Sequence, residues 1–122
     1  MTFLLKIKKS SQNGNFLRIN PYICVMRVIA RKTLKQFWEK HKDCEQQLKT
    51  WYDEAAEANW LTPKEIKTNY PSASFLVNNR VVFNIKGNSY RLIVRINYKY
   101  KMVWIRFVGT HAQYDKIDAT KI

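Results

Sequence analysis

The sequence predicts a single α+β domain, in which a helical hairpin is followed by an antiparallel sheet of three to four strands. Its 122 residues suffice for one domain with a hydrophobic core and are too few for two. Apolar residues make up 46% of the chain, and Gly and Pro number only three each, as in a folded globular protein. The hydrophobic period changes from 3.6 to 2 residues after Ser72, so the helices precede the sheet.

The first half of the domain predicts a short strand and two amphipathic helices. MRVIAR (26–31) alternates apolar and polar residues, with β-branched side chains, as strands do. Apolar stripes at helical spacing follow, and Asp43 is the expected N-cap of the second helix. The stripes are Leu34, Phe37, Trp38 and His41 in the first helix and Leu48, Trp51, Ala55 and Ala58 in the second. On such a stripe His41 is a core or boundary residue and not a catalyst.

The second half predicts a short third helix and then the sheet. LTPKEIKTNYP (61–71) offers Thr62 as N-cap, Pro63 as the first helical residue and Glu65 as the reciprocal cap, while Pro71 ends the helix. The period-2 segments are 81–85, 89–97 and 102–108, joined by the turns KGN and YKYK, with 73–77 as a possible fourth strand.

Residues 1–25 are predicted to be an extension outside the domain of residues 26–122. They contain SSQNGN and NPY, and they show no sustained helical or strand period. The clear pattern begins at Met26, which is therefore also a candidate for the natural start.

Basic residues outnumber acidic ones by 22 to 9. The excess lies in the second half, because the segment from Lys64 to Tyr114 carries nine basic residues and one acidic residue, Glu65. Such a field favours a polyanionic partner. Nucleic acid is favoured over a membrane surface, since the basic residues follow strand spacing and not one face of a long helix.

The two cysteines indicate free thiols. Cys24 and Cys44 are too few, and lack the motif spacing, for a zinc site or a disulfide framework. The sequence has no secretory apolar segment and no apolar run of 18 residues. We therefore expect a cytoplasmic protein.

Three arginines are expected to converge on one face of the sheet. In strand 89–97 the apolar face consists of Tyr90, Leu92, Val94 and Ile96, and the opposite face of Arg91, Ile93, Arg95 and Asn97. In strand 102–108 the apolar face is expected to take Val103, Ile105 and Phe107, and the opposite face Trp104 and Arg106. A solvated face and an anion-binding face both fit this pattern. The scarcity of acidic partners favours the anion, because arginines without a counter-charge repel one another.

The segment THAQYDKID follows at the edge of this arginine face. His111 lies three residues before Tyr114 and four before Asp115, so these side chains can share one face of a helical turn. They are able to move protons or orient a hydroxyl, while arginines stabilise charge on a phosphate, which suits metal-free cleavage of a phosphodiester. A structural alternative stays open, in which Thr110 or Asp115 only caps a short helix.

Four segments carry a resemblance to a known family: RVIARKTLKQFWEKH, LTPKEIKTNYPSASFL, VVFNIKGNSYRLIVRI and IRFVGTHAQYDKID. From Met26 to about Ala119 the chain resembles the HigB-type toxins of bacterial type II toxin-antitoxin systems, a branch of the RelE-like mRNA interferases. The resemblance implies a RelE-like fold, with two N-terminal helices packed on a twisted antiparallel sheet. Residues 1–25 lie outside it.

The resemblance also implies a function and partners. Such toxins cut messenger RNA, typically while it is translated in the ribosomal A site, by attack of the 2′-hydroxyl and with no metal or other cofactor. A HigA-like antitoxin with a helix-turn-helix domain is implied, and operator DNA is contacted only through the complex. The alternative function is a non-catalytic RNA- or ribosome-binding module with the same fold.

Carried over to this chain, the resemblance implies two sets of site residues. The catalytic set is Arg91, Arg106, His111, Tyr114 and Asp115. The RNA-binding set is Lys86, Asn88, Arg95, Lys99 and Lys101. The two catalytic arginines are expected to hold the phosphate and Tyr114 to orient or stack on the RNA. Either His111 or Asp115 is expected to handle the proton of the attacking hydroxyl.

Overall fold

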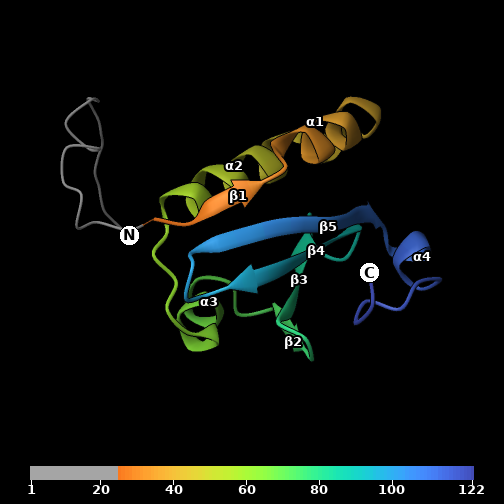
Figure 1. The fold of residues 1–122 in the computed structure, drawn as a ribbon. Helices are drawn as coiled ribbons and strands as arrows, with labels where there is room; N and C mark the ends of the chain where they lie inside the picture. Colours follow the sequence, from red (N-terminus) through yellow and green to blue (C-terminus); the bar gives the residue numbers. More distant parts are fainter. Residues whose placement is uncertain (1–24) are drawn as a thin grey trace, which may run out of the picture.

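The computed structural model describes residues 25–122, and the predicted extension lies outside the described residues except for Val25. Figure 1 shows α1 and α2 lying over one face of a sheet, with the C-terminal end near its other face. The helices are α1 (Arg31–Lys40), the 3₁₀ turn η2 (Lys42–Cys44), α2 (Glu45–Glu57), α3 (Pro63–Asn69) and α4 (His111–Tyr114). The strands are β1 (Arg27–Ile29), β2 (Ser74–Leu76), β3 (Arg80–Ile85), β4 (Tyr90–Asn97) and β5 (Met102–Thr110). None of these helices is long and apolar enough to cross a bilayer.

The sheet confirms the predicted α+β class, the antiparallel meander, the short strand within residues 26–31 and the possible fourth strand within residues 73–77, and these two short strands form its edges. Its order is β1-β5-β4-β3-β2, with antiparallel pairing from β2 to β5. The five strands exceed the predicted three to four, and β1 runs parallel to β5. Two parallel strands need a long connection, and nearly the whole domain lies between β1 and β5. The local pattern of either strand therefore does not indicate that the two pair.

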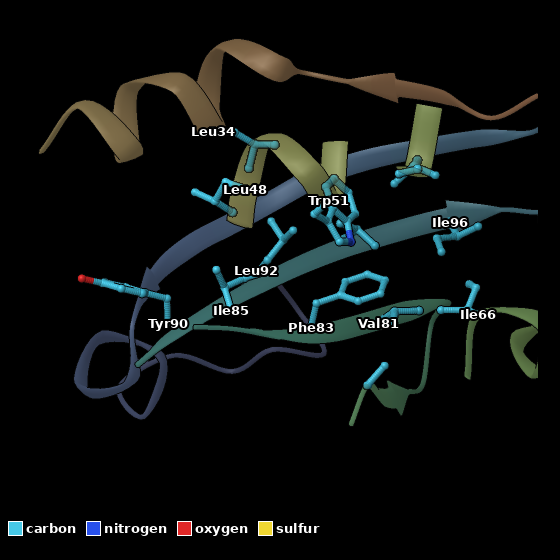
Figure 2. Packing of buried hydrophobic residues seen from close by; sticks show 14 of the residues in the cluster. Leu34, Leu48, Trp51, Ile66, Val81, Phe83, Ile85, Tyr90, Leu92 and Ile96 are labelled. Carbon is cyan, nitrogen blue, oxygen red and sulfur yellow. The ribbon is translucent and has the colours of Figure 1, made fainter. Parts of the chain in front are cut away.

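The core lies between the two long helices and the inner face of the sheet, as the helical stripes predict. Leu34 and Trp38 of α1 and Leu48, Trp51 and Ala55 of α2 are at most 4% exposed. Figure 2 shows Leu48 and Trp51 facing the side chains of β3 and β4 across this layer. The burial of these apolar side chains is the main force that holds the helices on the sheet.

A β-bulge in β5 overturns the predicted face of Phe107. The β4–β5 register runs from Val94 opposite Ile105 directly to Ile93 opposite Phe107, which leaves Arg106 as the extra residue. A bulge shifts the alternation of side chains by one. Phe107 therefore lies on the arginine face beside Ile93, and Val108 takes its place against the core.

Two predicted helix caps differ from the structure. Cys44, not Asp43, occupies the N-cap position of α2, because a 3₁₀ turn precedes the helix and the Asp43 carboxylate binds side chains of the sheet. Thr62 is the N-cap residue of α3 and Pro63 its first residue, as predicted, but the Thr62 side chain makes no capping bond. The Glu65 carboxylate accepts its hydrogen bond from the Leu61 N–H, one residue earlier than a capping box requires.

The arginine face is partly covered by the end of the chain. Val82 and Ile93 on this face are 3% and 0% exposed. The segment after α4 returns across β5 and β3, where Arg106, Arg80 and Asn78 bind the main-chain oxygens of Ile122 and Thr120. The face is therefore neither fully solvated nor fully open.

Candidate active site

Helix α4 begins directly where β5 ends, and a capping box determines that start. The Thr110 Oγ1 accepts a hydrogen bond from the Gln113 N–H at 3.1 Å, and the Gln113 Oε1 accepts one from the Thr110 N–H at 2.9 Å. Thr110 is thus a cap, as the structural alternative proposed. Asp115 caps nothing at this helix start, so its carboxylate is available to a side chain.

His111 and Asp115 form a pair on this helix. The His111 Nδ1 lies 3.0 Å from the Asp115 Oδ2, and the two side chains are 48% and 59% exposed. When Nδ1 carries the hydrogen that this contact requires, a neutral imidazole keeps its lone pair on Nε2. The pair therefore presents an oriented, solvent-accessible proton acceptor.

Arg91 lies beside the same helix. Its Nη1 donates to the Asn88 carbonyl at 3.1 Å and its Nη2 to the Asn88 Oδ1 at 3.2 Å. Its Cζ stands 5.6 Å from the centre of the Tyr114 ring, a cation–π distance. The strand register explains the meeting, because Arg91 is opposite Gly109, two residues before α4. Four of the five predicted catalytic residues therefore come together with Asn88 at one end of β4 and β5.

Gly109 is required at this corner by close packing. A Cβ added to it would lie 2.5 Å from the Phe107 Cζ and 2.7 Å from the Gln113 Oε1. Only a residue without a side chain lets the Gln113 amide reach back to cap α4 beside the Phe107 ring. The glycine thus helps to seat the helix that carries His111.

Arg106, the fifth predicted catalytic residue, belongs to a second group of arginines. The Arg106 Nε donates to the Ile122 main-chain oxygen at 3.4 Å, and Arg80 donates to the same oxygen through Nε at 3.2 Å and Nη2 at 2.8 Å. Arg95 is directly opposite Arg80 and stacks over the Trp104 ring at 5.7 Å. Burial and the charges of Arg95 and Arg106 lower the pKa of Arg80. In the part of the chain that the structure describes, no side-chain carboxylate pairs with these three arginines.

Arg80 is the site residue that the sequence interpretation missed. It lies on the arginine face because Arg80, Val82 and Asn84 alternate with the core residues of β3. This alternation was readable in the sequence, but the predicted strand began one residue later, at Val81.

The three lysines of the predicted RNA-binding set lie at opposite ends of β4. The Lys86 Nζ is 2.9 Å from the Asp43 Oδ2 and forms an ion pair with it. Lys99 and Lys101 lie in the turn at the other end of β4, about 20 Å from Arg91 at the usual rise of about 3.3 Å per residue. Lys101 there donates to the Trp60 carbonyl at 3.5 Å.

The fold and this site define a class of small basic α+β proteins, with a helical hairpin on one face of the sheet and a histidine–aspartate pair beside arginines at its edge. Residues 44–117 match the model of the HigB toxin family, described as the RelE-like toxic component of a toxin-antitoxin system. The chain belongs to this family. It is accordingly a toxin component, with a cognate antitoxin as its partner.

Individual relatives agree with the family match. The mRNA interferase HigB of Escherichia coli O6:H1 is 28% identical over 94 residues, which cover 75% of this chain and 91% of the relative. The mRNA interferase toxin HigB of Escherichia coli K12 and the mRNA interferase HigB of Shigella flexneri are each 28% identical over 92 residues. These matches cover 74% of this chain and 88% of those two proteins.

Proposed function

We propose that this toxin is an mRNA endoribonuclease that cuts messenger RNA during translation and so inhibits growth. The observation that carries the proposal is the His111–Asp115 pair, held next to Arg91 on a sheet that carries almost no acidic residues. A proton acceptor beside a fixed cation is what cleavage of an RNA phosphodiester requires. The names of the relatives, mRNA interferases, support the same activity.

The proposed reaction is attack of the RNA 2′-hydroxyl on the neighbouring phosphorus. His111 Nε2 takes the hydroxyl proton, and the Asp115 carboxylate holds the imidazole through Nδ1 and stabilises its charged form. Arg91 stabilises the additional negative charge on the phosphorane, and Tyr114 orients or stacks on the RNA. The bond from phosphorus to the 5′ oxygen breaks and that oxygen takes a proton from water, so the products are a 2′,3′-cyclic phosphate and a 5′-hydroxyl. The chemistry proposed for these residues involves no metal or other cofactor.

The second group of arginines is proposed to hold the RNA strand on either side of the reacting phosphate. Arg80, Arg95 and Arg106 lie on the same face as Arg91, and their charges are uncompensated by any described side chain. Guanidinium groups in such an arrangement are suited to phosphate oxygens. RNA binding there requires that the main-chain oxygen of Ile122 give up its arginine contacts. Lys99 and Lys101, at the far end of the sheet, are proposed contacts farther along the RNA or on the ribosome.

Incubation of the purified protein with translating ribosomes, followed by mapping of transcript ends, tests the function. We expect new 5′-hydroxyl ends in translated messages with the wild type and none with Arg91→Ala. Intact messages at saturating wild-type protein would contradict the nuclease and favour the alternative, a non-catalytic RNA- or ribosome-binding module. A parallel reaction on free RNA determines whether the ribosome is required.

The antitoxin is proposed to be a HigA-like protein with a helix-turn-helix domain. Operator DNA is proposed to be contacted through the antitoxin in the complex, since the helix-turn-helix domain is the part that enters a DNA groove. Since the proposed substrate is messenger RNA under translation, the proposed location is the cytoplasm.

The domain is proposed to span residues 26–122, with residues 1–25 as an extension. Met26 is 2% exposed in the core, and its N–H donates to the Ala58 carbonyl at 2.9 Å. The 94 residues matched in the first relative agree with a domain of this length. A version that begins at Met26 should keep the thermal midpoint and the cleavage activity of the full chain. A large fall in the midpoint would show that residues 1–25 belong to the folded unit.

A further inference from the structure

Asp43 links the helical layer to the sheet through two hydrogen bonds from one carboxylate. It lies in η2, between α1 and α2. Its Oδ1 accepts from the Tyr90 hydroxyl at 2.7 Å, and its Oδ2 accepts from the Lys86 Nζ at 2.9 Å. Lys86 begins the turn between β3 and β4, and Tyr90 directly follows it, so the carboxylate binds both ends of that turn.

The β3–β4 turn contains two consecutive residues with positive φ. Lys86 and Gly87 have φ values of 52° and 64°, in the left-handed region, and Ser89 N–H donates to the Lys86 carbonyl at 3.2 Å. A non-glycine residue such as Lys86 adopts this region at a cost in free energy. The Asp43 ion pair is a contact that holds the Lys86 side chain in place.

The same turn supplies the acceptors that hold the proposed active site. The Ser89 carbonyl accepts from the His111 N–H at 3.1 Å, which ties α4 to the start of β4. The Asn88 carbonyl and side-chain oxygen accept from Arg91 at 3.1 and 3.2 Å. Asp43 is thereby connected to Arg91 and His111 through residues of a single turn, without touching either.

Tyr90 is held on its other side by the ring of Phe37 in α1 and by the ring of His41, which directly follows α1. The Phe37 and His41 rings stack at 4.3 Å, and the Tyr90 ring meets each of them edge-on at 5.5 Å. Figure 2 shows the Tyr90 hydroxyl pointing away from the core layer, at the end opposite Ile96. The bond to Asp43 raises the pKa of Tyr90 to about 12, and the Lys86 and Tyr90 bonds lower the pKa of Asp43. At neutral pH the phenol therefore donates to a charged carboxylate.

We propose that Asp43 is a positioning residue for RNA cleavage, which fixes the β3–β4 turn through Lys86 and Tyr90 and thereby places Arg91 and His111. The inference rests on the proposed function. It gives Lys86 the role of a partner of Asp43 in place of an RNA contact. It also assigns the helical hairpin a part in the reaction, although the hairpin covers the opposite face of the sheet.

The test compares Asp43→Asn with Glu45→Gln in the ribosome assay. Both changes remove one negative charge from the same region of the chain. Within residues 25–122, however, Glu45 forms ion pairs only with Lys42 and Lys49, which lie close to it in sequence. We expect Asp43→Asn to lower kcat by about tenfold to hundredfold with little change in KM, because small displacements of reacting groups have effects of this size. Glu45→Gln should match the wild type. An unchanged kcat for Asp43→Asn, or equal losses in both variants, would overturn the proposal.

A double-mutant cycle separates positioning from direct RNA contact by Lys86. If the two residues act as a pair, Asp43→Asn combined with Lys86→Met should cost no more than the larger single change. If Lys86 instead binds RNA, Lys86→Met will raise KM equally in both backgrounds, which contradicts the inference.

Amide hydrogen exchange without RNA distinguishes failure of this inference from failure of the proposed function. In Asp43→Asn the His111 amide, bonded to the Ser89 carbonyl, should exchange severalfold faster than in Glu45→Gln, while core amides of β4 stay unchanged. An unchanged exchange rate of the His111 amide in Asp43→Asn would contradict the positioning role, even if the wild type cuts RNA. Faster exchange in a wild type that does not cut RNA would leave the turn linkage intact and the nuclease assignment wrong.

Discussion

His111→Ala will lower the rate of RNA cleavage by about 10²–10⁴-fold, the range that a general base contributes. The substitution removes the only side chain on α4 that combines a ring nitrogen with an orienting carboxylate. Because His111 is 48% exposed, the free energy of unfolding should change by no more than about 0.5 kcal/mol. Cleavage rates measured with saturating ribosomes, beside thermal unfolding of the same samples, check both halves of this expectation.

Asp115→Asn is the companion variant. It keeps the shape of the side chain and removes its negative charge. His111 therefore stays in place but loses its anionic partner. We expect a loss smaller than that of His111→Ala. Asp53→Asn is the matched control, because Asp53 is exposed on α2, on the other side of the sheet. This variant should cleave RNA as the wild type does. Wild-type rates in His111→Ala would show that another group takes the proton.

Phe83→Ala will destabilise the fold by about 3–5 kcal/mol, the usual cost of truncating a buried aromatic side chain. The Phe83 ring is 1% exposed and has the Trp51 ring at 5.3 Å, the Tyr70 ring at 5.1 Å and the Trp60 ring at 6.5 Å. It thus joins α2, the end of α3 and β3 in one cluster. A loss of this size is a large fraction of the stability of a small domain, so soluble expression should also fall. Denaturant unfolding gives the measured value.

Phe75→Ala serves as the control for this prediction. Phe75 lies on the neighbouring strand β2, opposite Val81, but is 37% exposed at the edge of the sheet. Its truncation leaves no closed cavity and should cost about 1 kcal/mol or less. Equal costs for the two phenylalanines would mean that the core is not organised around Phe83.

The predictions that succeeded depend on local periodicity. The stripes of α1 and α2 and the alternation in β4 each describe which side chains face one core, and burial of those side chains gives the same answer in the structure. The proximity of Arg91 to α4 was also predictable, because Arg91 lies at the start of the β4–β5 hairpin and His111, Tyr114 and Asp115 follow directly after its end. The predicted face of Phe107 was wrong, because the bulge at Arg106 inserts one residue into the alternation of β5. No feature of the sequence MVWIRFV indicates this bulge.

The sequence by itself determined the class of fold, the elements from which it is built, the positive field and the family to which the chain belongs. Only the tertiary structure decided the partners of individual charges. Asp43 is a plausible helix cap and Lys86 a plausible RNA contact when each is read locally, yet they bind each other across 43 positions of the chain. Arg106 likewise joins Arg80 and not Arg91. Such pairings depend on distances between distant segments, and those distances are set when the helices pack on the sheet.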